Sequence, residues 1–144
     1  MIIHKDSHTD HVSPETLEHV LERFAGRDGF FIETFELPDG RPPLPCALYG
    51  PDVGDAPVTD AECVMRARPG RAYQSRTVPR PARPTRTCTV IAGPYAGSPC
   101  VLFTAFGGPC APKELGDPNL KPEERPASEA FWARHALASL PMEG

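Results

Sequence analysis

Three histidines fall within eight residues near the N-terminus, in the stretch "HKDSHTDHV" that holds His4, His8 and His11. Imidazole nitrogens bind zinc, and three of them form the ligand set of some zinc enzymes. Nothing here predicts a helix that would gather the three rings, and the chain has neither an HExxH motif nor paired cysteine spacings. We therefore expect no metal and no cofactor. The histidines are either proton-transfer groups contributing to an anion site or part of a flexible, solvated arm over residues 1–12.

Acid/base chemistry on a phosphodiester is a second role for histidine, provided that cations and hydroxyl groups hold the phosphate. The chain offers such groups in "GRAYQSR" (70–76) and in "VLFTAFGG" (101–108). Thr104 is expected to be a single hydroxyl on a strand face with Cys100, Leu102 and Phe106, where it needs a ligand oxygen or a cross-strand partner. The candidate catalytic residues are His8, His11, Arg76 and Thr104, and the candidate substrate-binding residues are Arg71, Tyr73, Ser75, Arg80, Arg83 and Arg86.

Charge is strongly segregated along the 144 residues, although the net charge is only −4. Residues 1–62 hold thirteen acids and four bases, whereas residues 63–113 hold seven arginines, one lysine and no acid. Such a segment creates a positive field that attracts phosphate or carboxylate groups. Two explanations stay open. The arginines bind an anionic ligand, with RNA as the first guess, or they pair with the acids of the first 62 residues.

The periodicity of apolar residues predicts an α+β fold with an N-terminal helix, one mostly antiparallel sheet of about five strands and a C-terminal helix. Residues 69–86 contain too many prolines for a central strand and are predicted to be an exposed loop that carries arginines. The whole chain, 1–144, is expected to form a single domain. Helices are expected at 13–26 and 127–140, strands at 30–37, 46–50 and 62–68, and a hairpin from 85–93 and 100–108.

The cysteine pattern bears on the compartment. Five cysteines, an odd number, occur without a CxxC pair, which favours buried reduced thiols over a disulfide framework. The N-terminus turns polar within four residues, so no signal peptide is expected, and no apolar run is long enough to span a membrane. These features indicate a small cytoplasmic protein.

The segment "RTCTVIAG…SPCVLFTAFGGPCAPKE" resembles the terminal hairpin of the barnase–EndoU–colicin–RelE-like superfamily of metal-independent ribonucleases. The resemblance covers about a quarter of the chain. It implies an RNA-cleaving enzyme in which Thr104 is the hydroxyl of the closing strand, Arg86 an arginine of the sheet and His11 the histidine beside the helix. The chain departs from the family in the helix expected after the hairpin and in its acidic net charge. The segments "RPTR", "TAFGGP" and "FWARHAL" also resemble small bacterial proteins without an assigned activity.

A non-catalytic binding module is the alternative from another functional class. In this interpretation the arginine-bearing segment docks on an acidic protein partner or on a second copy of the chain, with Tyr73 and Arg76 as anchors. The histidines are then spectators. Salt dependence does not separate this alternative from an enzyme, because both contacts are electrostatic.

Overall fold

The computed structural model of the chain describes residues 1–140. Two compact units divide the chain between them. Unit 1 consists of residues 1–45 and 84–109, and unit 2 consists of residues 46–83 and the chain from Cys110 onward. The chain therefore passes from one unit to the other three times. A single-domain organisation of residues 1–144 stays a prediction.

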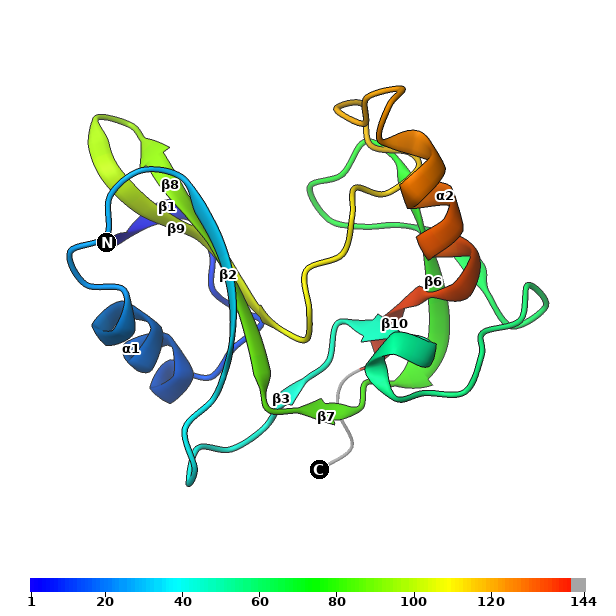
Figure 1. The fold of residues 1–144 in the computed structure, drawn as a ribbon, viewed down its shortest axis with the longest axis horizontal. Helices are drawn as coiled ribbons and strands as arrows, with labels where there is room; N and C mark the ends of the chain where they lie inside the picture. Colours follow the sequence, from blue (N-terminus) through cyan, green and yellow to red (C-terminus); the bar gives the residue numbers. More distant parts are fainter. Residues whose placement is uncertain (141–144) are drawn as a thin grey trace. The chain divides into compact units, whose positions relative to one another are not determined.

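Unit 1 is built on a four-stranded sheet with the order β1-β9-β8-β2, which Figure 1 shows beside helix α1. β8 is antiparallel to both of its neighbours, whereas β1 is parallel to β9. A two-stranded antiparallel sheet of β3 and β7 belongs to the same unit. The elements of unit 1 are β1 (Ile2–His8), α1 (Pro14–Arg23), β2 (Phe31–Glu36), β3 (Leu44–Pro45), β7 (Pro84–Thr85), β8 (Thr87–Tyr95) and β9 (Ser98–Gly107).

The N-terminal helix α1 is present as predicted, and local sequence explains both of its ends. Ser13 Oγ accepts a hydrogen bond from the backbone N–H of Thr16 at 3.2 Å, which satisfies one of the free N–H groups of the first turn. Gly26 adopts a φ of +83°, a conformation that glycine takes without steric cost and that ends the helical path. Val20 and Phe24 are buried against β2 and β8, so the apolar stripe of the helix forms the core of unit 1.

Residues 2–8 form a strand, whereas the sequence predicted no element there and left open a flexible, solvated arm over residues 1–12. Ile2–His8 form β1 and pair with β9, where Ile2 lies opposite Val101, Ile3 opposite Leu102 and His8 opposite Thr104. The sequence concealed this strand because residues 4–8 are polar throughout and show no alternation. β1 lies at the edge of the sheet, with most of its side chains exposed, so a polar sequence is compatible with it.

The predicted hairpin is confirmed as β8 and β9, but a bulge changes the direction of Thr104. Ala92 pairs with Leu102, whereas the preceding residue of β8, Ile91, pairs with Thr104, so Phe103 is an extra residue in β9. Leu102 and Ala105 are buried, while Thr104 is half-buried. The expected common face of Thr104 with Cys100 and Leu102 is therefore wrong, because a bulge shifts the alternation of a strand by one residue.

Unit 2 contains a second four-stranded sheet, with the order β4-β10-β6-β5. β10 is antiparallel to β4 and parallel to β6, and β5 is antiparallel to β6. Helix α2 precedes β10 directly, and its Trp132 packs with Cys46 and Leu48. The elements of unit 2 are β4 (Leu48–Tyr49), the 3-10 turn η1 (Pro51–Val53), β5 (Val64–Ala67), β6 (Gln74–Pro81), α2 (Arg125–Arg134) and β10 (Ala136–Leu140).

The segment predicted as an exposed arginine-bearing loop, 69–86, contains β6 and β7 instead. Pro79 and Pro81 lie within β6 although proline cannot donate a ladder hydrogen bond. β5 pairs only with Gln74–Thr77, so both prolines lie past the end of that ladder and have only β10 as a paired neighbour. The strand therefore tolerates prolines that would interrupt a sheet paired on both sides.

The C-terminal helix is shorter than predicted. Helix α2 ends at Arg134, His135 has the extended φ and ψ of −127° and 161°, and residues 136–140 continue as β10. An α+β fold with two helices is confirmed, but the single sheet of about five strands is wrong: within residues 1–140 the strands form sheets of four, four and two strands. The second large sheet was missed because its two central strands, β6 and β10, were predicted as a loop and as part of the C-terminal helix. Neither of the helices within residues 1–140 is long and apolar enough to cross a membrane.

Candidate functional site

Most of the predicted arginines are engaged by groups of their own unit. Arg83 Nη1 lies 3.0 Å from Asp55 Oδ1, and Arg86 donates to the backbone carbonyls of Arg41 and Pro38 at 2.8 and 2.6 Å. A guanidinium bound in this way holds a loop in place. The acids that pair with Arg76, Arg80 and Arg83 all belong to the acidic first 62 residues, as one of the two explanations expected.

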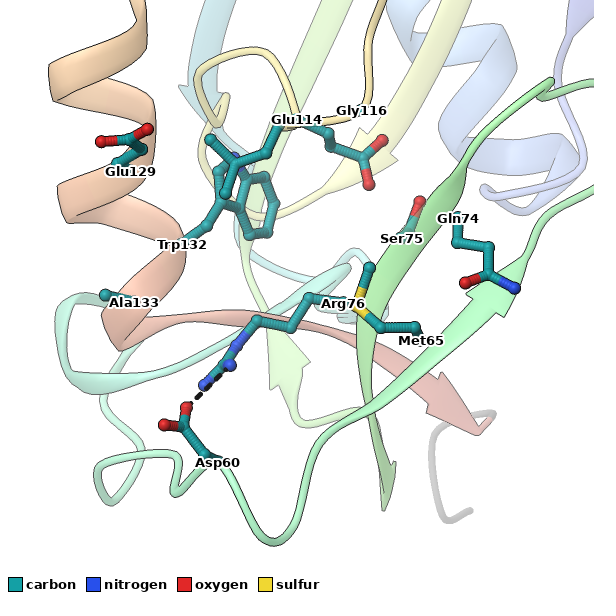
Figure 2. A pocket seen from close by; sticks show the side chains of 11 residues that line it. Asp60, Met65, Gln74, Ser75, Arg76, Glu114, Gly116, Glu129, Trp132 and Ala133 are labelled. Carbon is teal, nitrogen blue, oxygen red and sulfur yellow. Dashed lines mark hydrogen bonds and ion pairs between the residues drawn. The ribbon is translucent and has the colours of Figure 1, made fainter.

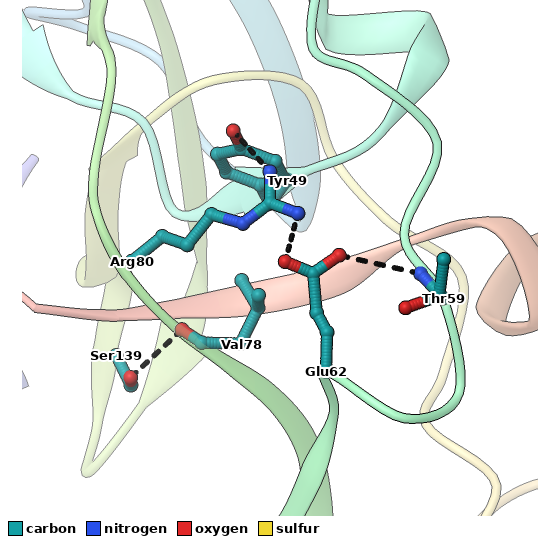
Figure 3. A network of polar contacts seen from close by, with 6 residues as sticks. All are labelled: Tyr49, Thr59, Glu62, Val78, Arg80 and Ser139. Atoms are coloured by element: carbon teal, nitrogen blue, oxygen red, sulfur yellow. Dashed lines mark hydrogen bonds and ion pairs between the residues drawn. The ribbon is translucent and has the colours of Figure 1, made fainter.

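Arg80 is engaged by two side chains of unit 2. Figure 3 shows its guanidinium between the carboxylate of Glu62 and the hydroxyl of Tyr49, to which Nη1 donates at 2.6 Å. The other oxygen of Glu62 accepts from the backbone N–H of Thr59 at 3.4 Å. The network connects β4, β6 and the segment before β5, which assigns Arg80 to the stability of unit 2.

A cavity of about 340 Å³ lies in unit 2, and Figure 2 shows the side chains around it. Its walls come from five parts of the chain: Asp60 in the segment before β5, β5 itself, the first residues of β6, the segment 114–116 and one face of α2. Predicted site residues Ser75 and Arg76 line it, together with the unpredicted Glu114 and Trp132. The remaining lining residues are Asp60, Met65, Gln74, Leu115, Gly116, Glu129 and Ala133.

Three buried polar atoms at this cavity have no hydrogen-bond partner within residues 1–140: Ser75 Oγ, Arg76 Nη2 and Glu114 Oε1. Ser75 is only 1% exposed. A buried polar atom without a partner costs about 1–3 kcal/mol, so native proteins seldom retain several of them together. All three belong to residues that line this one cavity, whereas the other such atoms of unit 2, on Asp55, Ser128 and His135, belong to residues outside its lining.

Arg76 holds its position through its other nitrogens. Nε donates to the backbone carbonyl of His135 at 3.2 Å, and Nη1 donates to Asp60 Oδ1 at 3.0 Å. The Asp60 side chain is 96% exposed, and an ion pair so close to water contributes only about 0–1 kcal/mol. Arg76 is therefore oriented by a backbone carbonyl while its charge is only weakly neutralised.

Glu114 is anchored in a complementary way. Its Oε2 accepts from Arg68 Nη1 at 3.1 Å and from the hydroxyl of Tyr73 at 3.3 Å. Burial is the main cause that raises the pKa of Tyr73, and the negative charge of Glu114 raises it further, so the phenol remains a donor at neutral pH. The predicted residue Tyr73 thus positions Glu114. Arg71 lies 5.9 Å from the Tyr73 ring and is exposed.

Unit 1 brings together two other predicted residues. His8 lies opposite Thr104 across the parallel pair β1 and β9, and both side chains reach solvent at least in part. His11 is exposed and lies 3.7 Å from its neighbour Asp10. Arg86, in the same unit, is engaged by carbonyls of residues 37, 38 and 41. The predicted catalytic set is thus divided between the two units, with Arg76 in unit 2 and the other three in unit 1.

Burial disfavours the reactive thiolate form of Cys46, Cys88 and Cys110. All five are free thiols, and burial raises the pKa of Cys46 and Cys110 and brings that of Cys88 to about 11. A thiol with a raised pKa is protonated at neutral pH and reacts slowly. Within residues 1–140 no group of three or more His, Cys, Asp or Glu side chains is placed to hold a metal ion.

Sequence reasoning missed Glu114 and Trp132. Glu114 is the first acid after the basic segment 63–113, which was the available signal, but its neighbours in sequence suggested only an irregular stretch. Trp132 lies in the helix expected at 127–140, and it both packs with Leu48 and lines the cavity. Searches of family models, curated proteins and solved structures found no match to this chain. The ribonuclease resemblance therefore rests on its quoted residues alone.

Proposed function

We propose that this protein binds a small phosphate-bearing molecule in the unit 2 cavity, with the phosphate at Arg76 and Ser75. The observation that carries the proposal is a pair of buried unpartnered atoms, Arg76 Nη2 and Ser75 Oγ, on two residues of β6 that line the cavity. A guanidinium nitrogen is a donor only, and a serine hydroxyl donates or accepts, so each of them is able to bind an oxygen of a phosphate group. Of the candidate substrate-binding residues expected between positions 71 and 86, the proposal uses those in the first part of β6.

Arg76 is preferred over the other arginines because its guanidinium keeps a free buried nitrogen. Arg80 is held by Glu62 and Tyr49, and Arg86 by three backbone carbonyls. Arg76, in contrast, has only the exposed partner Asp60 for its charge. An incoming phosphate gains a charge-assisted hydrogen bond without first displacing a buried ion pair.

Ser75→Ala provides the test, because it distinguishes a hydroxyl that binds the ligand from one that takes no part in binding. In the free protein the change removes a buried hydroxyl without a partner, so the free energy of unfolding should rise by about 1 kcal/mol or stay unchanged. Affinity should fall about threefold to tenfold, as expected for one lost hydrogen bond. Calorimetric titration with two phosphate esters of equal length, phosphoethanolamine and propyl phosphate, measures the affinity, and urea unfolding measures the stability.

The control is Ser139→Ala, which removes a hydroxyl that donates to the carbonyl of Val78 at 2.8 Å and does not line the cavity. It should lower stability slightly and leave affinity unchanged. If neither ester binds the wild-type protein saturably, or if Ser75→Ala binds both as tightly as the wild type, the proposed function is wrong.

A metal-independent ribonuclease is the second candidate, and the pairing of His8 with Thr104 favours it. A histidine beside a hydroxyl supplies a proton-transfer group next to a group that orients a phosphate. Incubation of total RNA with the protein in EDTA tests it: cleavage by the wild type should be lost in His8→Ala and in Thr104→Val. Absence of cleavage, or cleavage that survives both changes, removes this candidate. A cytoplasmic location, which suits the five free thiols, is part of both proposals.

A further inference from the structure

The residues that line the cavity carry more negative than positive charge. Asp60, Glu114 and Glu129 contribute three carboxylates, and Arg76 is the single base of the lining. Arg68, which pairs with Glu114, and Arg125, which pairs with Glu129, supply two further positive charges next to the cavity. Like charges repel more strongly where side chains are partly withdrawn from water. A ligand that brought only negative charge would bind Arg76 but would be opposed by Glu114, whose side chain is 15% exposed.

The free oxygen of Glu114 defines what the ligand must present on that side. Oε2 accepts from Arg68 and Tyr73, whereas Oε1 is buried and has no partner within residues 1–140. An ionised carboxylate oxygen only accepts hydrogen bonds, so the group that meets Oε1 must be a donor. A positively charged donor also gains a charge-assisted hydrogen bond to this buried carboxylate oxygen.

At β6 the ligand must present a hydrogen-bond acceptor instead of a donor. Arg76 Nη2 only donates, so the ligand group at Arg76 must be an acceptor, and Ser75 Oγ is able to complete its coordination. Figure 2 shows that the two requirements come from different walls, with Glu114 on the segment 114–116 and Arg76 on β6. The wall on α2 is the indole of Trp132. Because its Nε1 already donates to the carbonyl of Lys113 at 3.2 Å, it offers the ligand ring atoms, which favour a nearby cation.

We infer that the ligand is a zwitterion with a phosphate group for Arg76 and Ser75 and an ammonium group for Glu114. This inference rests on the proposed function and specifies its substrate class as free aminoalkyl phosphates. The zwitterion places its negative end at the single base of the lining and its positive end at the free carboxylate oxygen. It satisfies all three unpartnered atoms, and its ammonium group gains a charge-assisted hydrogen bond to the buried carboxylate oxygen.

Phosphoethanolamine and propyl phosphate form a matched pair for the test, since an ammonium group in the first replaces a methyl group in the second. Calorimetric titration of the full-length wild-type protein should give phosphoethanolamine at least about tenfold tighter binding, which corresponds to about 1.4 kcal/mol. Glu114→Gln keeps the shape of the side chain and removes its charge. It should weaken phosphoethanolamine by about tenfold and leave propyl phosphate unchanged or slightly tighter. Glu123→Gln, an exposed position outside the cavity, is the charge-matched control and should change neither affinity.

The outcomes separate this inference from the proposed function. Equal affinity for the two esters, or an effect of Glu123→Gln as large as that of Glu114→Gln, overturns the zwitterion while the phosphate site stands. Binding of neither ester overturns both. Co-sedimentation with phosphatidylethanolamine vesicles, without binding of free phosphoethanolamine, would assign the same chemistry to a lipid headgroup and overturn the free solute as ligand.

Discussion

Replacing Phe24 with alanine is expected to lower the free energy of unfolding by about 3–5 kcal/mol, the usual cost of removing a buried aromatic ring. Phe24 is 2% exposed at the end of α1, and its ring lies 5.3 Å from that of Phe31 and 5.6 Å from that of Phe35, measured between centroids. The change would leave a void between the helix and β2 that these rigid rings do not fill. Urea unfolding followed by circular dichroism measures the loss.

Phe30→Ala is the matched control, because it makes the same chemical change one residue before β2 at a side chain that is 66% exposed. A loss below about 1 kcal/mol is expected there, as for most exposed positions. Equal losses for the two variants would contradict the placement of Phe24 in the core of unit 1.

Replacing Trp132 with alanine should cost unit 2 a similar amount, about 3–5 kcal/mol, and should also weaken the binding of phosphate esters. The indole is 4% exposed, packs at 5.0 Å against the Phe131 ring and lines the cavity. Its removal deletes the contact of α2 with Leu48 and widens the cavity at the wall opposite β6. Circular dichroism is again the measure of stability, because Trp132 is the single tryptophan and its fluorescence is lost with it.

Trp132→Phe separates packing from hydrogen bonding. It keeps an aromatic ring but leaves the carbonyl of Lys113 without its donor, so the expected loss is about 1–2 kcal/mol. A loss in Trp132→Phe as large as that in Trp132→Ala would mean that the hydrogen bond, and not the packing of the ring, holds α2 in place.

Local signals were sufficient for part of the fold. Helix α1 carries its cap at Ser13 and its apolar stripe within one short stretch, and β8 and β9 are rich in β-branched and aromatic residues close to their turn. These elements depend on neighbours in sequence. They were therefore predictable from periodicity and capping rules.

The other elements depend on partners that are distant in sequence. β6 contains prolines that argue against a strand. They are tolerated because β5 pairs only with Gln74–Thr77, before the first proline. β10 continues directly from α2, and its identity as a strand comes from the parallel pairing of Leu137 with Thr77 and Ala138 with Val78. No local rule indicates such a pairing, since intrinsic strand preference depends on context.

Only the β6 side of the candidate site was predictable from sequence, because its other residues come from distant parts of the chain. The basic segment singled out Ser75, Arg76 and Tyr73, but it could not distinguish Arg76 from Arg80, whose guanidinium is held by Glu62 and Tyr49. Only three-dimensional structure reveals which arginine keeps a free nitrogen. Glu114 and Trp132 complete the cavity from segments about 40 to 60 residues further along the chain, and no sequence motif links them to β6.

The most direct test of ligand binding in the unit 2 cavity is a ¹⁵N NMR titration with phosphoethanolamine that follows the indole Nε1–H signal. The chain has one tryptophan, so this signal reports on Trp132 without ambiguity. Saturable shifts of the indole and of the amides of Ser75 and Gly116, with His8 and Thr104 unchanged, are the result we predict. Shifts at His8 and Thr104 with an unchanged indole would contradict the cavity as the ligand site and would favour the pair on β1 and β9.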